Sequence, residues 1–320
     1  MTLAWVIGSR GLLGAALCRA LRRDGTAVFA PAERFPWHDP VALAASMKAA
    51  IEQFESQAGD AARWELYWAA GVGTMSGDEA DIQPETRALA QLLQFLGAST
   101  RLMTMPGAVS LASSAGAIYA GATDSVITEA TRPQPTTPYA FAKLQQETLV
   151  ESFVQMHANL YGMAARISTL YGPGQANGKK QGLLTHIARK IIRNQLIQIY
   201  VPFDTIRDYI PADDAAGVMI RSLRAQAAAS GFVVKIVASE RPTTIAEIVS
   251  TFKRIVRRAP RIVTSASRMT SLYSRRVQFR SVVLPAAGAV SSTSLAVGIS
   301  QLMIAERAAF GRGSQGETRT

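Results

Sequence analysis

The stretch Leu3-Ala4-Trp5-Val6-Ile7-Gly8-Ser9-Arg10-Gly11-Leu12-Leu13-Gly14-Ala15-Ala16-Leu17 decides the fold. Its first five residues are apolar and typical of a buried strand, the glycines form a turn, and an apolar helix face follows. Gly8 allows the tight turn, Gly11 lets the backbone approach a phosphate, and Gly14 lets the helix pack closely. Because a helix N-terminus attracts anions, this turn predicts a pyrophosphate site.

Apolar strand-like runs alternate with helical stretches along the rest of the chain. These runs span residues 4–7, 27–30, 66–70, 108–112, 164–168 and 232–237. The alternation predicts an α/β fold, a Rossmann-type doubly wound parallel sheet with helices on both faces. A chain of 320 residues with 48% apolar content is long enough to bury a substantial core.

A second stretch with chemical potential is Thr137-Pro138-Tyr139-Ala140-Phe141-Ala142-Lys143. If Pro138 opens a helix, Tyr139 and Lys143 lie one turn apart on the same face. A phenol with a pKa of about 10 needs roughly 4 kcal/mol of phenolate stabilisation to titrate near pH 7. One cation at about 4 Å, in an effective dielectric of about 20, supplies about that much. The pair is therefore a candidate acid–base pair, although an aromatic ring packed on a lysine stem has the same spacing.

The glycine turn, Tyr139 and Lys143 together resemble the extended short-chain dehydrogenase/reductase superfamily, specifically the nucleotide-sugar-modifying NAD-dependent epimerase/dehydratase family. Three more stretches agree with this resemblance. Residues 111–119 resemble the family's serine-bearing strand end, residues 165–174 its strand and substrate loop, and residues 205–214 its Arg-Asp-Tyr-Ile block. The resemblance runs in consistent order to about residue 220 and then thins to residues 295–299.

The family resemblance implies a division into two parts. The Rossmann core is expected in residues 1–170, rejoined by about 211–240. A smaller C-terminal substrate lobe is expected from residues 171–210 and 241–310, over the carboxyl ends of the strands, where ligands bind in open sheets. The polar, glycine-rich residues 311–320 are expected to form a disordered tail.

The resemblance also implies catalytic roles for Ser114, Tyr139 and Lys143. Tyr139 as a phenolate would take a proton from a sugar hydroxyl while hydride passes to a nicotinamide ring, and reduction would reverse these roles. Lys143 would hold the ribose hydroxyls and lower the pKa of Tyr139. Ser114 would hydrogen-bond the reacting oxygen, with the adjacent Ser113 as the alternative.

The expected cofactor is NAD(P), with NADP favoured. The second strand ends without an acidic residue at its immediate end, and Arg10 and Arg34 are placed to clamp a 2′-phosphate. Glu33 is close enough to serve as the acid of an NAD site, which leaves NAD open. The stretch Trp68-Ala69-Ala70-Gly71-Val72-Gly73 resembles the turn after the family's fourth strand, where small residues admit the nicotinamide ribose. The expected cofactor ligands are Gly8, Arg10, Gly11, Leu12, Gly14, Arg34, Ala69, Ala70, Gly71, Tyr139 and Lys143.

The expected substrate is a nucleotide-diphosphate sugar. The net charge is +11, and no acidic residue lies between Glu247 and Glu306. From the Arg275–Arg280 cluster, Arg276 is expected to bind the substrate diphosphate, as is Arg207. Ser114 and Tyr171 are the other expected substrate ligands. A solvated basic face explains the same arginines, and an ion pair with Asp208 or Asp213 explains Arg207. No nucleic-acid-binding motif is visible, so no such partner is expected.

The motifs leave two enzymatic activities open. The family's 4,6-dehydratases carry an Asp-Glu pair after the catalytic serine or threonine, where this chain has Ala115 and Gly116, so dehydration is not expected. A nucleotide-sugar epimerase is placed slightly ahead of an NADPH-dependent reductase of a nucleotide keto-sugar. A non-catalytic dinucleotide-binding or RNA-associated module is the third hypothesis, against which the intact Ser114, Tyr139 and Lys143 argue.

Several further features limit partners and location. The sequence shows no signal peptide and no membrane span, and its single Cys18 excludes an internal disulfide, so a cytoplasmic protein is expected. The three histidines lack ligand partners, so no metal is expected.

A homodimer is expected because relatives pair the tyrosine-bearing helix with the preceding long helix. Leu144, Leu149, Phe153 and Met156 follow Tyr139 with roughly helical spacing. An internal core explains this stripe equally well.

Overall fold

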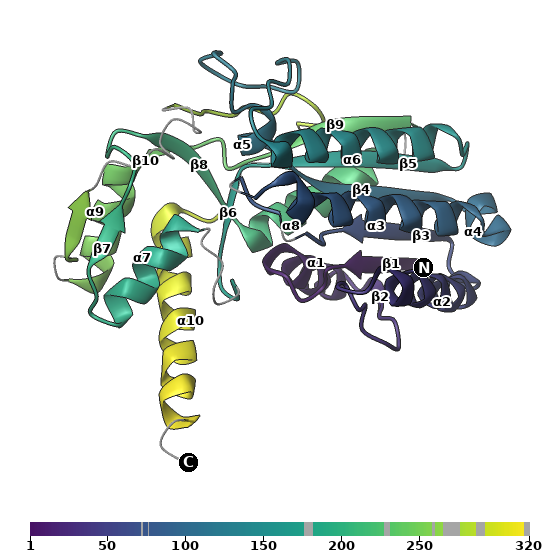
Figure 1. Ribbon diagram of the computed structural model, residues 1–320, viewed down its shortest axis with the longest axis horizontal. Helices are drawn as coiled ribbons and strands as arrows, with labels where there is room; N and C mark the ends of the chain where they lie inside the picture. The colour runs from purple at the N-terminus through teal and green to yellow at the C-terminus, as the bar shows by residue number, and fades with distance from the viewer. Residues whose placement is uncertain are drawn as a thin grey trace.

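A parallel sheet of six strands forms the centre of the larger part of the molecule, on the right in Figure 1. The structure is a computed structural model that describes residues 1–71, 73–75, 77–175, 182–226, 231–257, 260–264, 276–285 and 292–316. The strands are β1 (Thr2–Ile7), β2 (Ala27–Phe29), β3 (Arg63–Trp68), β4 (Gly107–Ser114), β5 (Leu160–Ile167) and β9 (Gly231–Val237). Their order is β2-β1-β3-β4-β5-β9, and every neighbouring pair is parallel. This confirms the predicted doubly wound Rossmann-type fold.

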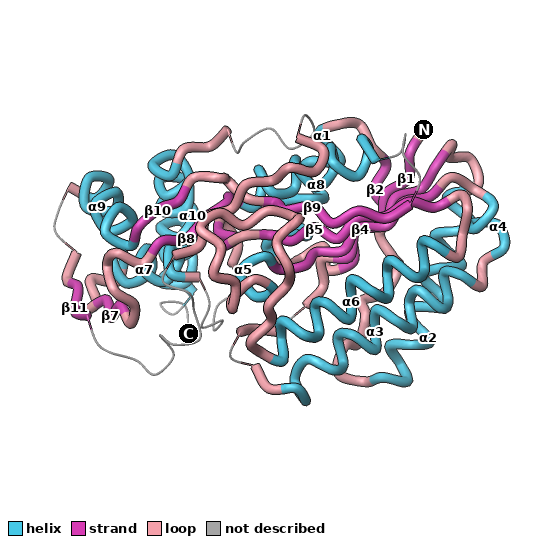
Figure 2. The backbone as a smooth tube through the Cα atoms, turned by 90° about the horizontal axis from the view of Figure 1, so that it is seen from above, coloured by secondary structure: helices cyan, strands magenta, loops and turns pink. Residues whose placement is uncertain are grey.

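Helices cover both faces of this sheet (Figure 2). On one face lie α2 (Pro40–Ala58), α3 (Glu79–Gly97) and α6 (Pro138–Gln155), and on the other lie α1 (Leu12–Arg23) and α8 (Ala212–Gln226). The short helices α4 (Thr100–Thr104) and α5 (Ala115–Ile118) lie at opposite ends of β4. Because both faces are covered, the strands are mostly apolar, as the sequence runs indicate, and the charged side chains within them, such as Glu65 and Lys235, have buried partners.

A smaller group of elements packs around its own hydrophobic core. It contains β6 (Thr169–Tyr171), β8 (Ile206–Pro211) and β10 (Pro242–Thr244) in a three-stranded sheet of order β10-β8-β6. A two-stranded sheet joins β7 (Ile197–Ile199) to β11 (Ile262–Thr264). The helices are α7 (Leu183–Ile192), α9 (Ile245–Val256) and α10 (Leu295–Gly316), and their apolar faces meet in one core.

Residues 277–283 pack against the large sheet, although residues 241–310 were expected in the substrate lobe. Val277 and Phe279 pack in a core cluster with residues of α5 and β9. Lys235 of the edge strand β9 is buried and donates to the carbonyl oxygen of Val283 at 2.7 Å. A buried ammonium needs such acceptors, and an edge strand needs cover, so the segment returns to β9.

Helix α10 continues to Gly316, so residues 311–316 are helical, contrary to the disorder expected from residue 311. Each residue added to an existing helix gains a backbone hydrogen bond without a new nucleus, which a composition-based expectation ignores. Residues 317–320 lie outside the described residues.

The apolar stripe that follows Tyr139 on α6 mostly faces inward. Phe153 is buried, and Leu144 and Leu149 pack against core clusters, whereas Met156 is 72% exposed. The stripe is therefore largely internal core, and the homodimer stays a prediction.

Candidate active site

The glycine turn between β1 and α1 packs directly against the turn that follows β3. Gly8 has a φ of +84°, and a Cβ at this position would lie 2.6 Å from the backbone nitrogen of Ala70. A Cβ at Gly14 would lie 2.1 Å from the carbonyl oxygen of Gly8. Both glycines are therefore required by close backbone contacts, which hold the predicted cofactor residues Ala69 and Ala70 beside the glycine turn.

The start of α1 is open to a ligand. Gly11 is the exposed N-cap residue, and no side chain caps the helix. The amide groups of its first turn therefore have no side-chain acceptor, as an anion site at a helix N-terminus requires. Leu12 is the first helical residue. The turn fits the pyrophosphate of a dinucleotide.

The turn that contains Gly71 follows the third strand of this chain, although it resembles the turn after the family's fourth strand. Residues 30–62 supply only the helix α2 and no strand, so β3 pairs directly with β1. The predicted neighbourhood is nevertheless present, because the backbone amide of Ala69 donates to the carbonyl oxygen of Ile7 at 2.9 Å.

Tyr139 and Lys143 lie on one face of α6, as their spacing predicts. Thr137 caps the helix by accepting from the amide of Ala140 at 3.3 Å, and Pro138 occupies the first helical position. The ammonium of Lys143 lies 5.7 Å from the centre of the Tyr139 ring. Ser114, at the carboxyl end of β4, lies close enough to Tyr139 to lower the pKa of its phenol. The three predicted catalytic side chains therefore meet at the carboxyl edge of the sheet.

Ser113, the alternative serine, faces the opposite direction. Its hydroxyl donates to the carboxylate of Glu147 at 2.6 Å, and Glu147 forms a buried ion pair with Arg166 at 2.6 Å. Successive side chains of a strand point to opposite faces, so only one of the two serines can face Tyr139. That serine is Ser114.

Sequence reasoning missed Glu85, a buried carboxylate of α3 that contacts Lys143. The ammonium of Lys143 donates to Glu85 Oε1 at 2.7 Å and to Gln146 Oε1 at 3.0 Å. The side chains of Lys143 and Glu85 are only 7% and 6% exposed. The available signal was a charged residue on the apolar stripe of α3, between the buried Ile82 and Leu89.

Burial raises the pKa of Tyr139 above that of an ordinary phenol. Lys143 and the hydrogen bond from Ser114 lower this pKa, whereas the charge of Glu85 raises it. For Lys143 itself, burial lowers the pKa, but Glu85 and Tyr139 outweigh burial and the net pKa is raised. Burial and Glu85 therefore favour the protonated phenol of Tyr139, and the side chain of Lys143 is paired with Glu85 at 2.7 Å.

The surroundings of Glu85 fit a nicotinamide ribose. A Cβ on Gly71 would lie 2.8 Å from both carboxylate oxygens, so the turn after β3 reaches this carboxylate. Glu85 Oε2 is buried and has no hydrogen-bond partner among the described residues. A buried acceptor without a donor, next to Lys143, matches the hydroxyl groups of a ribose.

The arginines predicted to bind phosphates lie in two places. Arg10 and Arg34 are exposed beyond the carboxyl ends of the neighbouring parallel strands β1 and β2. Arg207 lies on β8, and Arg276 forms a backbone bridge with Ile206 of the same strand. The structure therefore brings Arg207 and Arg276 to neighbouring positions, whereas Arg275 lies outside the described residues.

The two aspartates considered as partners of Arg207 have other contacts. Asp213 pairs with Arg19 of α1 at 2.6 Å. Asp208 is buried and accepts hydrogen bonds from the hydroxyl groups of Ser168 and Ser239. Burial raises the pKa of Asp208, and these hydrogen bonds oppose that rise.

Tyr171 does not fit the predicted role of a substrate ligand. It is 2% exposed and packs in the core of the smaller group of elements. A Cβ on Gly298 of α10 would lie 2.0 Å from the hydroxyl oxygen of Tyr171. Helix α10 therefore covers Tyr171, and the sequence could not show this because the two residues are far apart in the chain.

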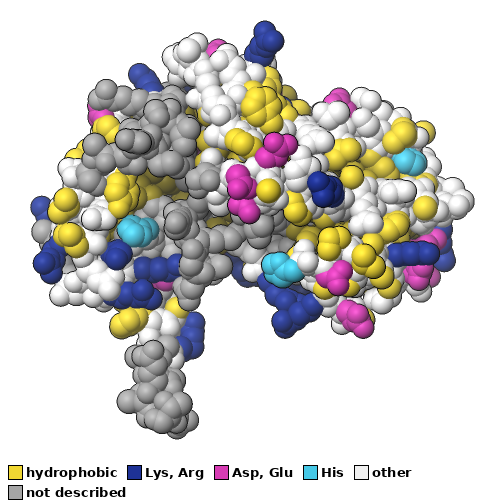
Figure 3. Space-filling model, in the orientation of Figure 1, with side chains coloured by type: hydrophobic (Ala, Val, Ile, Leu, Met, Phe, Trp, Pro, Cys, Tyr) yellow, Lys and Arg dark blue, Asp and Glu magenta, His cyan; other side chains and the backbone are white. Residues whose placement is uncertain are grey.

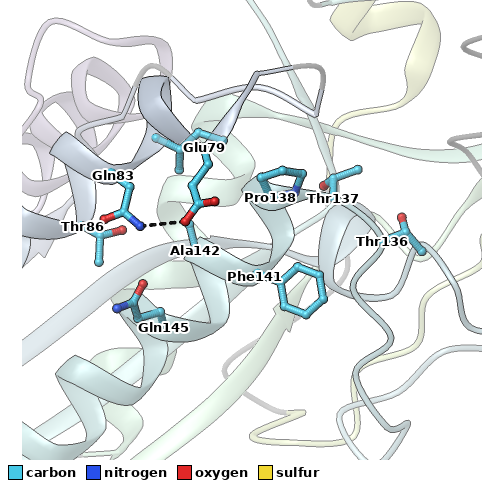
Figure 4. Close-up of a pocket in the computed structure, with 10 residues that line it drawn as sticks. Glu79, Gln83, Thr86, Thr136, Thr137, Pro138, Phe141, Ala142 and Gln145 are labelled. Atoms are coloured by element: carbon cyan, nitrogen blue, oxygen red, sulfur yellow. Dashed lines mark hydrogen bonds between the residues drawn. The ribbon is translucent and has the colours of Figure 1, made fainter.

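A separate cavity of about 240 Å³ lies between the first turns of α3 and α6 (Figure 4). Glu79, Gln83 and Phe141 are among the side chains that surround it. Its described lining includes none of Ser114, Tyr139 and Lys143, so it is not the candidate active site.

Exposed basic side chains form several separate groups on the face shown in Figure 3. Within the described ranges, no three His, Cys, Asp or Glu side chains are grouped to hold a metal ion. The described helices also include none with the length and apolar character needed to cross a membrane.

A parallel sheet of this order, with a glycine turn and a Tyr–Lys pair at its carboxyl edge, defines a dinucleotide-binding α/β protein of the short-chain dehydrogenase/reductase type. The model of the NAD dependent epimerase/dehydratase family matches residues 4–236. The chain belongs to this family.

Known proteins with a similar fold include two solved structures. The Thermus thermophilus UDP-glucose 4-epimerase in complex with NAD has a TM-score of 0.78 and 18% identity. RMD from Pseudomonas aeruginosa, complexed with NADPH, has a TM-score of 0.78 and 19% identity. Each comparison covers 97% of this chain and 100% of the other chain.

A curated relative is similar over a shorter stretch. The dTDP-4-dehydro-6-deoxyglucose reductase of Escherichia coli is 32% identical over 112 residues. This match spans 35% of this chain and 35% of the relative, so it covers about a third of the relative's length.

Proposed function

We propose that this protein is an NAD(P)-dependent enzyme that transfers hydride and a proton at a carbon of a nucleotide-linked sugar, and that it works as a keto-sugar reductase. One observation carries the proposal. Ser114 and Lys143 meet at Tyr139 beside the glycine turn, and burial raises the pKa of the Tyr139 phenol. A protonated phenol is the acid that carbonyl reduction requires.

Three side chains divide the work of the proposed reaction. The hydroxyl of Ser114 orients the carbonyl oxygen by donating a hydrogen bond. Tyr139 donates its proton to that oxygen, and Lys143 stabilises the phenolate that remains. A bound dinucleotide supplies the hydride that the carbonyl carbon gains. The carbonyl thus becomes an alcohol, with the hydride on carbon and the Tyr139 proton on oxygen.

Epimerisation, which the sequence favoured slightly, becomes the second candidate. It begins by oxidising an alcohol and therefore requires Tyr139 as a phenolate, which burial and Glu85 disfavour. The partial match to a reductase also favours reduction over epimerisation. Epimerisation stays a candidate because the same three side chains also serve that reaction, and because the family includes epimerases.

The proposed cofactor is NADP rather than NAD, bound with its pyrophosphate at the start of α1. Arg10 and Arg34 would bind the 2′-phosphate, because both are exposed near the ends of adjacent strands. The proposed substrate is a nucleotide-diphosphate sugar, with Arg207 and Arg276 binding its phosphates.

The test begins with the cofactor. The purified protein is denatured, any released dinucleotide is identified by mass spectrometry, and the apoprotein is titrated with NADH and NADPH by fluorescence. An exchangeable site that prefers NADPH is expected. Stoichiometric retained NAD would favour the epimerase, and no binding of either dinucleotide would revive the non-catalytic hypothesis.

Turnover is then measured with nucleotide keto-sugars as NADPH consumption. Tyr139→Phe is expected to keep its fold and NADPH affinity but to lose roughly 10²- to 10⁴-fold in turnover, the usual contribution of a general acid. Tyr200→Phe, at an exposed tyrosine, is the matched control. Full activity of Tyr139→Phe would exclude Tyr139 from the mechanism.

A further inference from the structure

The Glu85–Lys143 ion pair is buried between α3 and α6. Lys143 Nζ lies 2.7 Å from Glu85 Oε1, and both side chains are less than a tenth exposed. Gln146 links the pair to α3, because its amide donates to Glu85 Oε1 at 3.3 Å and to the hydroxyl of Thr86 at 3.1 Å. Lys143 is therefore fixed in position by neighbours on two helices.

The charged groups around Tyr139 come from only a few elements. Lys143 lies one turn along α6, and Glu85 reaches the pair from α3. Glu147 lies one further turn along α6, but Arg166 of β5 neutralises it. Ser114, from the end of β4, contributes a neutral hydroxyl. Glu85 is thus the carboxylate in direct contact with the lysine that controls Tyr139.

We propose that Glu85 is a positioning residue of the active site, which orients and neutralises Lys143 and thereby keeps Tyr139 as a proton donor. Ser114, Tyr139 and Lys143 remain the catalytic residues, and Glu85 acts on Tyr139 through Lys143. A lysine without a counter-charge would favour the phenolate and hence oxidation of an alcohol. The paired lysine favours the phenol and hence reduction of a carbonyl. The catalytic consequence rests on the proposed function, whereas the effect on Tyr139 does not.

The sign of the expected pH dependence follows from the charges. Glu85 raises the pKa of Tyr139, so removing its charge lowers that pKa. Reduction needs the phenol, so its rate is constant below the pKa of Tyr139 and falls as pH rises through it. Glu85→Gln should therefore lose reductase activity at a lower pH than the wild type. Without Glu85, the charge of Lys143, 5.7 Å from the Tyr139 ring centre, is no longer neutralised, and a charge within about 4–6 Å shifts a pKa by about one unit or more.

The first test is a titration of the Tyr139 phenol in the apoprotein. Phenolate absorbance is recorded against pH for the wild type and Tyr139→Phe, and the difference between them isolates Tyr139. The protein with Tyr139 and the protein with Tyr139→Phe are then compared in the Glu85→Gln background, where the midpoint of the Tyr139 titration should fall by about one pH unit or more. Asp81→Asn, an exposed acid on the same helix, is the control and should leave the midpoint unchanged.

A second variant guards against a folding defect. Glu85→Leu replaces the buried carboxylate with an apolar side chain of similar size, and the midpoint should move in the same direction. Circular dichroism checks that each variant is folded. An unchanged or raised midpoint in a folded Glu85 variant would overturn the inference.

The pH profile of NADPH-dependent reduction provides the second readout. In Glu85→Gln the alkaline loss of activity should begin about one pH unit or more below that of the wild type. Failure of the wild type to bind a dinucleotide would overturn the proposed function, while the titration would still decide the role of Glu85. A normal wild-type enzyme with an unmoved Tyr139 titration would overturn only the inference about Glu85.

Discussion

Single exposed arginines are expected to decide which dinucleotide binds. Arg10→Ala and Arg34→Ala should each weaken NADPH binding roughly 10- to 100-fold, because each removes a charge-assisted hydrogen bond to the 2′-phosphate. NADH affinity should change little, since NADH lacks that phosphate. Fluorescence titration of the apoprotein measures both affinities, with Arg23→Ala at the exposed end of α1 as control. Equal losses for NADH and NADPH would contradict the assignment.

Among single residues, the sequence predicted those site residues whose relative positions are fixed within one helix or one turn. Tyr139 and Lys143 share a face because helical spacing fixes their relation. Glu85 could not be predicted, because a contact between α3 and α6 depends on how two helices pack. Burial of Tyr171 under α10 likewise depends on tertiary structure. The choice of Ser114 over Ser113 depends on which way β4 faces, and the sequence left that open.

For the turn between β1 and α1, the two glycines have different functions that substitution should separate. Gly14→Ala places a methyl group 2.1 Å from the carbonyl oxygen of Gly8, so α1 must move away from β1. Both stability and dinucleotide affinity should fall, with a loss in the free energy of unfolding of about 1–3 kcal/mol, as for overpacking in a core. Chemical denaturation and NADPH titration measure the two effects.

Gly11→Ala is the matched comparison. Its Cβ would lie 3.3 Å from the same oxygen, and the residue is exposed, so the fold should tolerate it. The added methyl group would nevertheless stand where a phosphate approaches the start of α1. NADPH affinity should fall while the free energy of unfolding changes little. Equal stability losses for the two variants would contradict this division.

Whole elements were predictable where their residues are uniformly apolar. The sequence located all six strands of the large sheet, but it began the third at Leu66 and the fifth at Ala164, whereas β3 begins at Arg63 and β5 at Leu160. Strand β3 includes Glu65, whose buried carboxylate is paired with Arg63 and Arg224. A charged residue interrupts an apolar pattern, and its partner on α8 is invisible before the chain is folded. Such long-range pairing explains the missed start of β3.

The arrangement of the whole molecule divides the proposed substrate between its two parts. The side chains that would do the chemistry lie at the carboxyl edge of the large sheet, whereas Arg207 lies on β8 of the three-stranded sheet. Strand β8 ends at Pro211, and α8, which packs on the large sheet, begins at the next residue. The strand that carries Arg207 is therefore connected directly to a helix of the larger part. A nucleotide held at Arg207 would therefore have a fixed position relative to Tyr139.

Arg207→Ala and Arg276→Ala should accordingly raise KM for a nucleotide-linked keto-sugar roughly 10- to 100-fold, because each removes a charged contact to phosphate. The value of kcat should stay within a few-fold, since a phosphate remote from the reacting carbon is bound equally in the ground state and the transition state. Steady-state kinetics of NADPH consumption separates the two constants, with Lys253→Ala at an exposed position of α9 as control. A keto-sugar without a nucleotide should react poorly and show no sensitivity to either arginine. If kcat fell while KM stayed constant, both arginines would act at the reacting carbon, and the proposed division of the substrate between the two parts would be wrong.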